Sequence, residues 1–405
     1  MRCHPSGGEN KVRKVVITGV GALTPFGPGV EDLRRGLREG RSALRQARGF
    51  DIAGLRASVV AEVEDSWIGE SPFDKDLERC LALALPAAKE TLHQADLSDP
   101  TDIAVLALGN AAGELRALEH YMVPETWGRD KEPNLRSPAS ITDRLGVTLG
   151  IRGKRLTFVN ACIASANAIA ACFDLIRMGE AEIALAGGVE ILTKSSLAGF
   201  DTLHALAPRL CRPFDQAREG AQLSEAAAFV VLESKDHADS RHQQPICEIC
   251  GYGMSSDAYH PTRSDPEGLG PRKAMERALA DANLRPDQID YIKAHGTATF
   301  QNDLIELVAI RHVFGEQAKK IPISAPKSQL GHATGACGAL ECLICVLALE
   351  GQFLPPTLNL ETPLPGFEDY DYVREAGRTA DLRYVLANSF GFGGVNLALV
   401  LAQPN

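Results

Sequence analysis

The feature that most constrains the fold is an alternation of strand-like and helix-like segments that runs along the chain twice. Apolar segments at 13–18 and 102–108 have the composition of strands, and segments at 30–39 and 74–95 have the periodicity of helices. A similar order restarts after residue 245. Alternating elements predict an α/β fold with a mainly parallel sheet covered by helices.

Two such halves indicate either two domains or one duplicated core. The stretch 234–245 between them is polar but too short for a flexible linker. We therefore expect one body whose halves are residues 13–245 and 246–405. The expected elements of the second half are strands at 246–252 and 289–299 and helices at 271–283, 303–314 and 335–350.

Charge and hydropathy exclude several classes of protein. The formal net charge of −10 argues against nucleic acid as the main partner, because phosphate binding needs a concentrated basic face. No stretch of about 18 uncharged apolar residues is present, and the N-terminus lacks the apolar segment of a secretory signal. We expect a cytoplasmic protein with no membrane partner.

Three glycine and cysteine patterns look like cofactor or metal motifs, but their contexts argue otherwise. The Gly-x-Gly at 19–21 lacks the third glycine of a dinucleotide fingerprint and is followed by Pro25. Cys247 and Cys250 lie in a predicted strand, where residues three apart face opposite sides. The pair at 342 and 345 lies in an apolar helix without turn residues. We expect no nucleotide or metal site.

Cys162 stands where a strand ends and a helix begins. The apolar strand stops at Asn160, and the helix begins just after Ala161. The unpaired N–H groups and the dipole of a helix N-terminus lower the pKa of a thiol, which prepares a nucleophile. Taken alone, Cys162 has an equally simple alternative as a small buried residue.

Three further segments place polar groups beside expected strand ends or loops. His295 follows an apolar strand, and the carboxyl ends of such strands bind ligands in open α/β folds. Lys327 and His332 lie in a loop before a helix. A glycine-rich turn at 388–396 offers backbone N–H groups that suit an oxyanion. A single histidine at a strand end is more often structural, so the combination matters.

Together these segments resemble the active-site motifs of the β-ketoacyl-acyl-carrier-protein synthases, the condensing enzymes of the thiolase superfamily. The matching segments run in the family's order between about residues 13 and 402: NACIASANAIA, AGGVE, CRPFDQAREG, SDAYHPT, HGTATFQND, PKSQLGHATGA and NSFGFGG. The resemblance implies a thiolase-like five-layered αβαβα sandwich of two similar halves, normally a homodimer.

The resemblance also implies catalytic roles. Cys162 would accept an acyl group from the phosphopantetheine of an acyl carrier protein as a thioester. His295 and His332 would promote decarboxylation of malonyl-ACP and stabilise the enolate as neutral donors. Lys327 would order the site and support His332, while Glu341 would pair with Lys327 from the following helix. No cofactor is implied beyond the carrier-borne phosphopantetheine.

Further residues would shape the substrate site. The backbone N–H groups of Cys162 and Phe392 would hold the thioester oxygen, and the Phe392 ring would gate the acyl pocket. Thr297 and Thr299 would hydrogen-bond the pantetheine arm, and Phe390 would bind substrate.

Four residues near these motifs receive weaker assignments, and one segment departs from the family. Asp303 and Glu306 are expected to give structural support, as acidic residues at a helix N-terminus do. Asp257 and His260 are expected to line the site. The family's Gly-Glu-Gly-Ala is Ser-Glu-Ala-Ala at 224–227, so either the packing adjusts or the loop shifts.

Ala112 falls where related enzymes carry a residue that limits the length of the acyl pocket. Its small side chain predicts tolerance of medium or long chains.

The resemblance leaves rival functions and several pathways open. A thiolase would carry a second cysteine near the C-terminal glycine-rich turn, and 388–396 contains none. A silent chain-length factor generally lacks the nucleophile, which this chain has, but pairing of an active ketosynthase with such a subunit stays an alternative to the homodimer. Fatty-acid, aryl-polyene and type II polyketide synthesis are all compatible with the residues, and the single 405-residue unit resembles the dissociated, type II arrangement.

Overall fold

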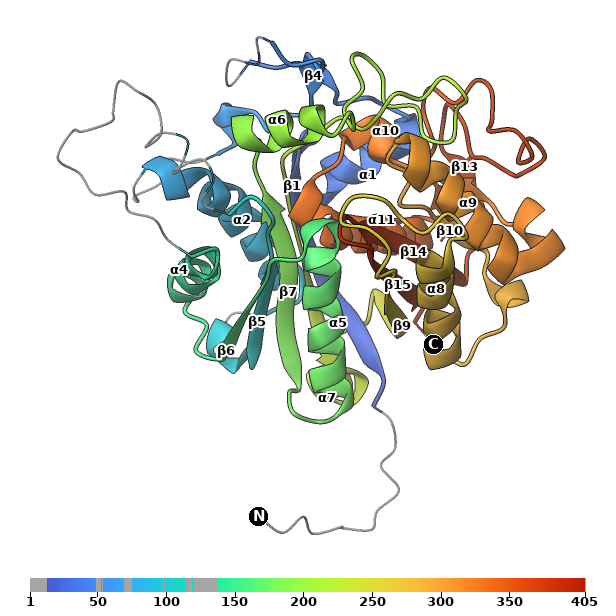
Figure 1. Cartoon of the computed structure of the whole chain (residues 1–405). Helices are drawn as coiled ribbons and strands as arrows, with labels where there is room; N and C mark the ends of the chain where they lie inside the picture. Colours follow the sequence, from blue (N-terminus) through green and yellow to red (C-terminus); the bar gives the residue numbers. More distant parts are fainter. Residues whose placement is uncertain are drawn as a thin grey trace, which may run out of the picture.

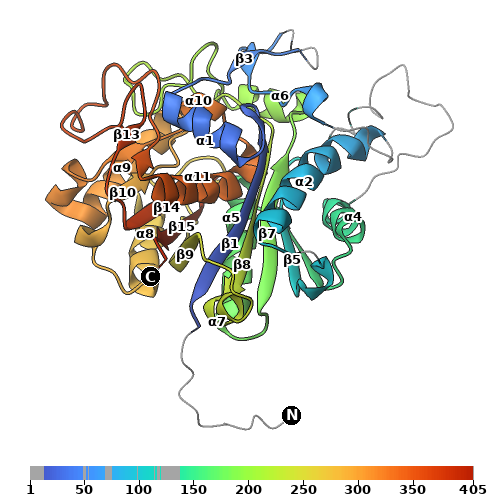
Figure 2. The same ribbon diagram turned by 180° about the vertical axis from the view of Figure 1, so that it is seen from behind.

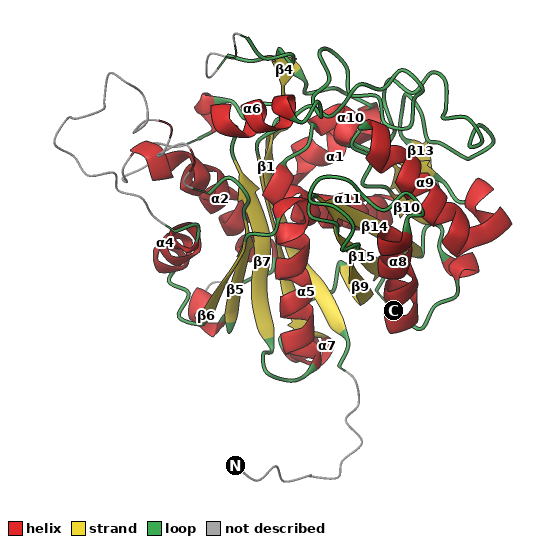
Figure 3. Ribbon diagram, viewed as in Figure 1, coloured by secondary structure: helices red, strands yellow, loops and turns green. Residues whose placement is uncertain are grey.

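The computed structural model describes residues 13–404 apart from 49–51, 53, 69–74, 98, 114, 116–118 and 120–136. Within this part of the chain, eleven strands form one mixed sheet in the order β11-β10-β14-β15-β9-β1-β8-β7-β5-β6, with β2 beside β1. Helices cover both sides of the sheet and fill the space between its two halves (Figures 1 and 3).

The two halves of this sheet have the same topology. The first contains β1 (Val15–Thr24), β5 (Val105–Gly109), β6 (Lys154–Phe158), β7 (Ile183–Glu190) and β8 (Ala226–Ser234). The second contains β9 (Cys247–Ser256), β10 (Tyr291–Lys293), β11 (Ile323–Ser324), β14 (Tyr384–Gly391) and β15 (Val395–Ala402). Numbered within each half, both follow the spatial order first, fifth, fourth, second, third.

The strand directions repeat as well. In both halves the fifth strand is antiparallel to its two neighbours, and the second strand is parallel to its two neighbours. Among the described strands, the two halves of the sheet are joined where β1 pairs with β9 over three residues, Val15 to Ile17. A common order and direction indicate one fold used twice, although the boundary drawn at residues 245 and 246 stays a prediction.

The expectation of a mainly parallel sheet is wrong, because β8 and β15 each run antiparallel to both of their neighbours. β8 is a buried apolar run, which periodicity alone does not distinguish from a helix segment. Gly393 and Gly394, with φ of 85° and 70°, turn the chain between β14 and β15. The "GFGG" sequence was therefore the available hairpin signal.

Five layers result, which confirms the predicted sandwich. On one outer face α2 (Lys75–Gln94) covers β1 and β8, and α4 (Ala139–Leu149) covers β5 and β6. On the other, α8 (Leu269–Asp281) covers β9 and β15, beside α9 (Phe300–Phe314). The central layer is α5 (Ala164–Arg177) and α11 (Cys337–Gly351), as Figures 1 and 2 show from opposite sides.

The remaining elements lie around this sandwich. The helices are α1 (Val30–Glu39), α6 (Lys194–Thr202), α7 (Lys235–Ser240) and α10 (Lys327–Leu330). The short strands are β2 (Gly27–Pro28), β3 (Arg45–Gln46), β4 (Val59–Val60), β12 (Phe353–Leu354) and β13 (Arg378–Thr379). α1 has the bounds that the amphipathic pattern predicts.

The central helices touch closely, which explains the composition of α11. A Cβ added at Gly338 would lie 2.4 Å from the backbone nitrogen of Ala166, and the Ala339 N–H donates to the Ser165 hydroxyl over 2.9 Å. The window Thr334–Gly351 is long and apolar enough to cross a membrane, but 83% of it is buried inside the protein. It is therefore the core helix of this fold. Cys342 and Cys345 are buried free thiols within it.

Gly338→Ala is expected to lower the free energy of unfolding by roughly 1–3 kcal/mol, because the new methyl group overpacks the contact between the helices. The matched control is Gly199→Ala in α6, where an added Cβ meets nothing within 4 Å. Urea unfolding of both variants measures the difference. Equal midpoints would show that α5 and α11 can separate at little cost.

Candidate active site

Cys162 lies in a tight turn between β6 and α5. The turn is the short 3-10 helix η3 (Ala161–Ile163), and it begins with Ala161 at a φ of 53°, a left-handed conformation that residues with a Cβ seldom adopt. The Cys162 side chain is 5% exposed. The turn therefore holds the sulfur at the N-terminal end of α5, where the sequence predicts it.

The predicted lowering of the thiol pKa is wrong for the free protein. Burial raises the pKa of Cys162 to about 12, and the charge of Lys327 and the backbone N–H of Phe392 offset this only in part. Desolvation disfavours the thiolate more than the helix terminus stabilises it. Cys162 is accordingly a protonated thiol at neutral pH.

The rate at which iodoacetamide alkylates Cys162 is expected to rise about tenfold per pH unit up to at least pH 10, because the thiolate fraction does so below the pKa. Intact mass against time at each pH gives the rate, and Cys162→Ala identifies the alkylated position. A plateau near pH 8 would contradict the raised pKa.

His332 lies beside this thiol in the loop after α10. Its Nε2 is 3.1 Å from Cys162 Sγ. Its backbone pairs with the segment before β8, since the His332 N–H donates to Gln222 O over 2.7 Å and the Ser224 N–H donates to His332 O over 3.1 Å. The loop is therefore fixed to the first half of the fold.

The departure at 224–227 affects this same contact. A Cβ added at Gly331, whose φ is 76°, would lie 2.9 Å from the Ser224 Cβ. The serine is accommodated because its neighbour is a glycine. Ala226 and Ala227 are fully buried in β8 and keep its register with β7.

His295 follows β10 and contacts Lys327, the first residue of α10. Lys327 Nζ lies 3.1 Å from His295 Nδ1 and donates to the His295 carbonyl over 2.5 Å. The His295 and His332 rings are 5.4 Å apart at 87°. The prediction that Lys327 supports His332 needs a correction. The Lys327 ammonium group hydrogen-bonds to His295, and its effect on His332 is that of its charge.

The contact with Lys327 sets the tautomer of His295. An ammonium group only donates hydrogen bonds, so the 3.1 Å contact with Lys327 favours the tautomer in which Nδ1 accepts and Nε2 carries the ring proton over one in which Nδ1 donates to Glu341 Oε1 at 3.6 Å. Burial, together with the Lys327 charge, lowers the pKa of His295 to about 3, and the same causes hold the pKa of His332 well below its usual value. Both rings are neutral at physiological pH, as the proposed donor role needs.

Glu341, one turn into α11, joins this network. Its Oε1 contacts the ammonium groups of Lys327 and Lys293 and lies 3.6 Å from His295 Nδ1, while its Oε2 accepts from the Ser389 hydroxyl over 2.5 Å. Burial opposes ionisation, yet Lys293 and Lys327 hold the pKa of Glu341 well below its usual value. The carboxylate is therefore ionised.

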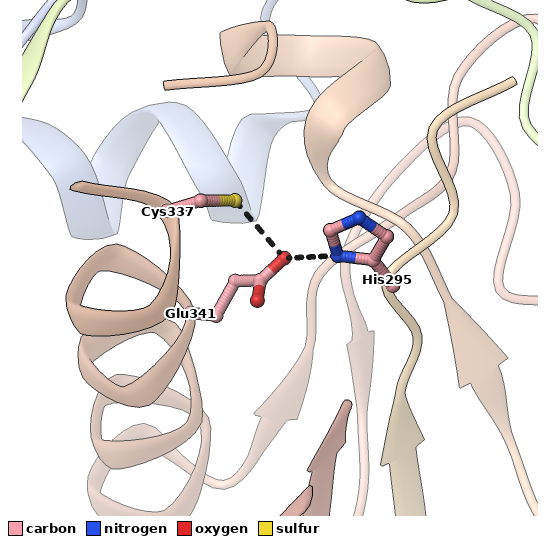
Figure 4. Close-up of side chains that lie close together, drawn as sticks. All are labelled: His295, Cys337 and Glu341. Atoms are coloured by element: carbon pink, nitrogen blue, oxygen red, sulfur yellow. Dashed lines mark hydrogen bonds and ion pairs between the residues drawn. The ribbon is translucent and has the colours of Figure 1, made fainter. Parts of the chain in front are cut away.

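His295, Cys337 and Glu341 gather within the reach of a metal ion (Figure 4). Their candidate ligand atoms lie within 4.8 Å of one another. Two ammonium groups already neutralise the carboxylate, however, and a divalent cation beside them would meet repulsion. The donor set fits an ion-pair network better than a metal site.

Asp303 and Glu306 support the loop that carries His295, but not only as favourable charges at a helix N-terminus. Glu306 is fully buried and accepts from the backbone N–H groups of His295 and Gly296, each over 2.8 Å. Asp303 accepts from the N–H of Ala298 over 3.0 Å, and Ala298 has a φ of 64°. The two carboxylates thus fix the loop backbone.

One cavity collects most of the predicted site residues. Its lining includes Cys162, His295, His332, Thr297, Thr299, Phe390 and Phe392. The two threonine hydroxyls are 2.9 Å apart. The lining includes neither Asp257 nor His260, so the prediction that they line the site is wrong; His260 instead accepts from the N–H of Thr262, which does line the cavity.

Phe200 of α6 also lines the cavity, and no sequence motif indicates it. Its ring lies 5.4 Å from that of Phe392 and 6.3 Å from that of His332. Lys293 was also missed, although a signal existed: it precedes His295 by two residues in the strand expected at 289–299, and such residues share a face of a strand.

Ala112 does not line this cavity. It is 6% exposed, and its N–H donates over 3.0 Å to Glu190, a buried residue of β7. Glu190 also accepts from the Gly335 N–H over 2.9 Å and so connects the loops before α4 and α11. The segments nearest to Ala112 in sequence include residues outside the described ranges, and its role in chain length stays a prediction.

Comparison with known proteins identifies the family of this chain. The chain matches the family model "Beta-ketoacyl synthase, N-terminal domain" over residues 12–238 and "Beta-ketoacyl synthase, C-terminal domain" over 246–361. It is 35% identical to 3-oxoacyl-[acyl-carrier-protein] synthase 2 of Coxiella burnetii, with 96% of this chain and 99% of the relative covered. It is 36% identical to a putative polyketide beta-ketoacyl synthase 1 of Streptomyces halstedii, with 97% and 98% covered.

Solved structures that are similar to this chain include ketosynthases. The ishigamide ketosynthase/chain length factor structure superposes with a TM-score of 0.89 at 33% identity, covering 97% of this chain and all of that one. A beta-ketoacyl synthase from Burkholderia phymatum gives 0.86 at 31%, with the same coverage. With both family models matched along most of its length, the chain belongs to the β-ketoacyl synthase family.

Proposed function

We propose that this protein is an acyltransferase that catalyses the decarboxylative Claisen condensation of a Cys162-bound acyl chain with malonyl-ACP. One observation carries the proposal: the thiol of Cys162 and the neutral imidazoles of His295 and His332 line one cavity. Lys327 donates a hydrogen bond to Nδ1 of His295, so the N–H of that ring is on Nε2, the nitrogen that does not contact the ion pairs. A nucleophile beside two hydrogen-bond donors suits acyl transfer followed by formation of an enolate.

In the first half-reaction, Cys162 Sγ attacks the thioester carbonyl of an acyl-ACP. Its proton passes to the departing pantetheine sulfur, and the Nε2–H of His332, 3.1 Å away, would donate to the Cys162 sulfur while that sulfur carries negative charge. The backbone N–H groups of Cys162 and Phe392 would hold the carbonyl oxygen while it carries negative charge. The Phe392 N–H already points at the sulfur, which supports this assignment.

In the second half-reaction, malonyl-ACP loses carbon dioxide and the electron pair of the broken C–C bond forms an enolate. The Nε2–H groups of His295 and His332 would donate to the enolate oxygen. The enolate carbon then attacks the Cys162 thioester carbonyl, and the sulfur leaves as thiolate and takes up a proton from water. Thr297 and Thr299 line the cavity and would hydrogen-bond the pantetheine arm.

The partner is an acyl carrier protein, and the enzyme acts as a dimer. Structures similar to this chain include a type II PKS acyl-carrier protein in complex with its ketosynthase and a ketosynthase in complex with its chain length factor. These neighbours favour a heterodimer with a chain-length-factor-like subunit as the alternative to a homodimer. Mass measurement of the native complex distinguishes the two.

The test is a reaction of the protein with a panel of acyl-ACPs and malonyl-ACP, read by intact mass. The expected product is a β-ketoacyl-ACP two carbons longer, and the small Ala112 side chain predicts that medium or long chains are accepted. The best-loaded chain would distinguish the fatty-acid, aryl-polyene and polyketide pathways. No extension, either alone or with a chain-length-factor-like subunit, would contradict the proposal.

A further inference from the structure

Lys293 is a second buried lysine in the site, and no step of the proposed reaction uses it. It is the last residue of β10, its side chain is 1% exposed, and its Nζ contacts Glu341 Oε1. Burying an ammonium group is costly unless it is paired, so its presence calls for an explanation.

The hydrogen bonds of Lys327 show why one lysine is not enough. An ammonium group has three N–H donors, and those of Lys327 are directed to His295 Nδ1, the His295 carbonyl and Glu341 Oε1. Two of the three therefore hold His295, and only one reaches the carboxylate. Lys293 brings the second positive charge to Glu341.

The surroundings of Lys293 fit such a role. Glu341, Cys337 and Cys345 face it from α11, Lys327 faces it from α10, and the two active-site histidines lie within reach of its charge. A second, small cavity is lined by Lys293, Lys327, Cys337 and Glu341. None of these four residues lines the substrate cavity.

We propose that Lys293 is a positioning residue. Its positive charge helps Lys327 to neutralise the Glu341 carboxylate, so that Lys327 keeps its hydrogen bond to His295 Nδ1 and fixes the tautomer of His295. Without Lys293, the carboxylate draws Lys327 away from His295 Nδ1, and the Nε2–H that faces the enolate is no longer enforced. The uncompensated Glu341 charge also disfavours the Cys162 thiolate. This inference rests on the proposed function only where substrate is used to test it.

The test is a double-mutant cycle between Lys293→Met and Glu341→Gln. Lys293→Met keeps the side-chain volume, and we expect it to slow malonyl-ACP decarboxylation and Cys162 alkylation each by about tenfold. In the Glu341→Gln background, the same change is expected to have no further effect, because Lys293 acts through Glu341. Lys273→Met, an exposed lysine of α8, is the control.

Each outcome of the cycle has a meaning. Additive effects, or no effect of Lys293→Met, would overturn the proposal. If Lys293→Met alone does not fold, the pH profile of Lys293→Arg, which keeps the charge, still decides. Alkylation needs no substrate, so a wild type that fails to decarboxylate malonyl-ACP contradicts the proposed function while the alkylation cycle still tests Lys293.

The pH profile gives a readout that packing alone would not change. Burial, with the charge of Lys327, lowers the pKa of Lys293 below its usual 10.5, so the wild-type decarboxylation rate is expected to fall on the alkaline side before that pH. Lys293→Arg keeps its charge to higher pH, and its profile should extend by one pH unit or more. Identical alkaline limbs in wild type and Lys293→Arg would overturn the proposal.

Discussion

Cys162→Ala is expected to lose acyl loading completely while it continues to decarboxylate malonyl-ACP. Loading requires the sulfur, because the acyl group is bound there as a thioester. In the proposed mechanism decarboxylation depends on His295 and His332, and the contacts of His295 with Lys327 and Glu341 do not pass through Cys162. Intact mass after incubation with acyl-ACP measures loading, and release of carbon dioxide from malonyl-ACP measures the second activity.

The matched control for this variant is Cys172→Ala. Cys172 is fully buried in α5, ten residues after Cys162, and lies outside the cavity lining. It should load as the wild type does, with some loss of stability. Acyl mass retained by Cys162→Ala would assign the nucleophile to another residue.

His295→Ala is expected to show the reverse pattern. Removing one donor to a developing oxyanion typically costs about 10²–10³ in rate, and we expect that loss in malonyl-ACP decarboxylation. Loading of Cys162 should persist, since the nitrogen nearest the sulfur belongs to His332. Single-turnover mass measurements of both half-reactions test this separation.

His312→Ala, on the exposed side of α9, controls for loss of a histidine outside the site. A variant at His295 that failed equally in both half-reactions would mean that the loop had collapsed or that His295 also serves loading. Thermal unfolding distinguishes these two results, because a collapsed loop would release the buried Glu306 carboxylate from its backbone partners.

Much of the fold could be predicted because its signals are local. The α/β alternation, the repeat after residue 245 and the bounds of α1 follow from periodicity and turn residues. The directions of the strands could not be predicted, because they depend on which strands pair. β8, for example, pairs with β1 across some 200 residues of chain.

Some features of the site could also be predicted from local sequence, and others depend on the packing of the chain. The motifs locate Cys162, His295 and His332, and the structure brings these three residues into one cavity. The pKa of Cys162 was mispredicted because the helix terminus is visible in sequence, whereas burial is a property of the packed chain. The partner of Lys327 likewise depends on how α10 faces β10.

The repeated topology has a consequence for how the chemistry is divided. Both central helices open with a 3-10 turn that follows the third strand of their half, η3 before α5 and η6 (Thr334–Ala336) before α11. In the proposed reaction, the first copy carries the electron-pair donor, Cys162, at this position, while the second copy supplies the histidines, the lysine and the carboxylate. Neither copy would then hold a complete set of reacting groups, so the proposed reaction depends on the contact between the two copies.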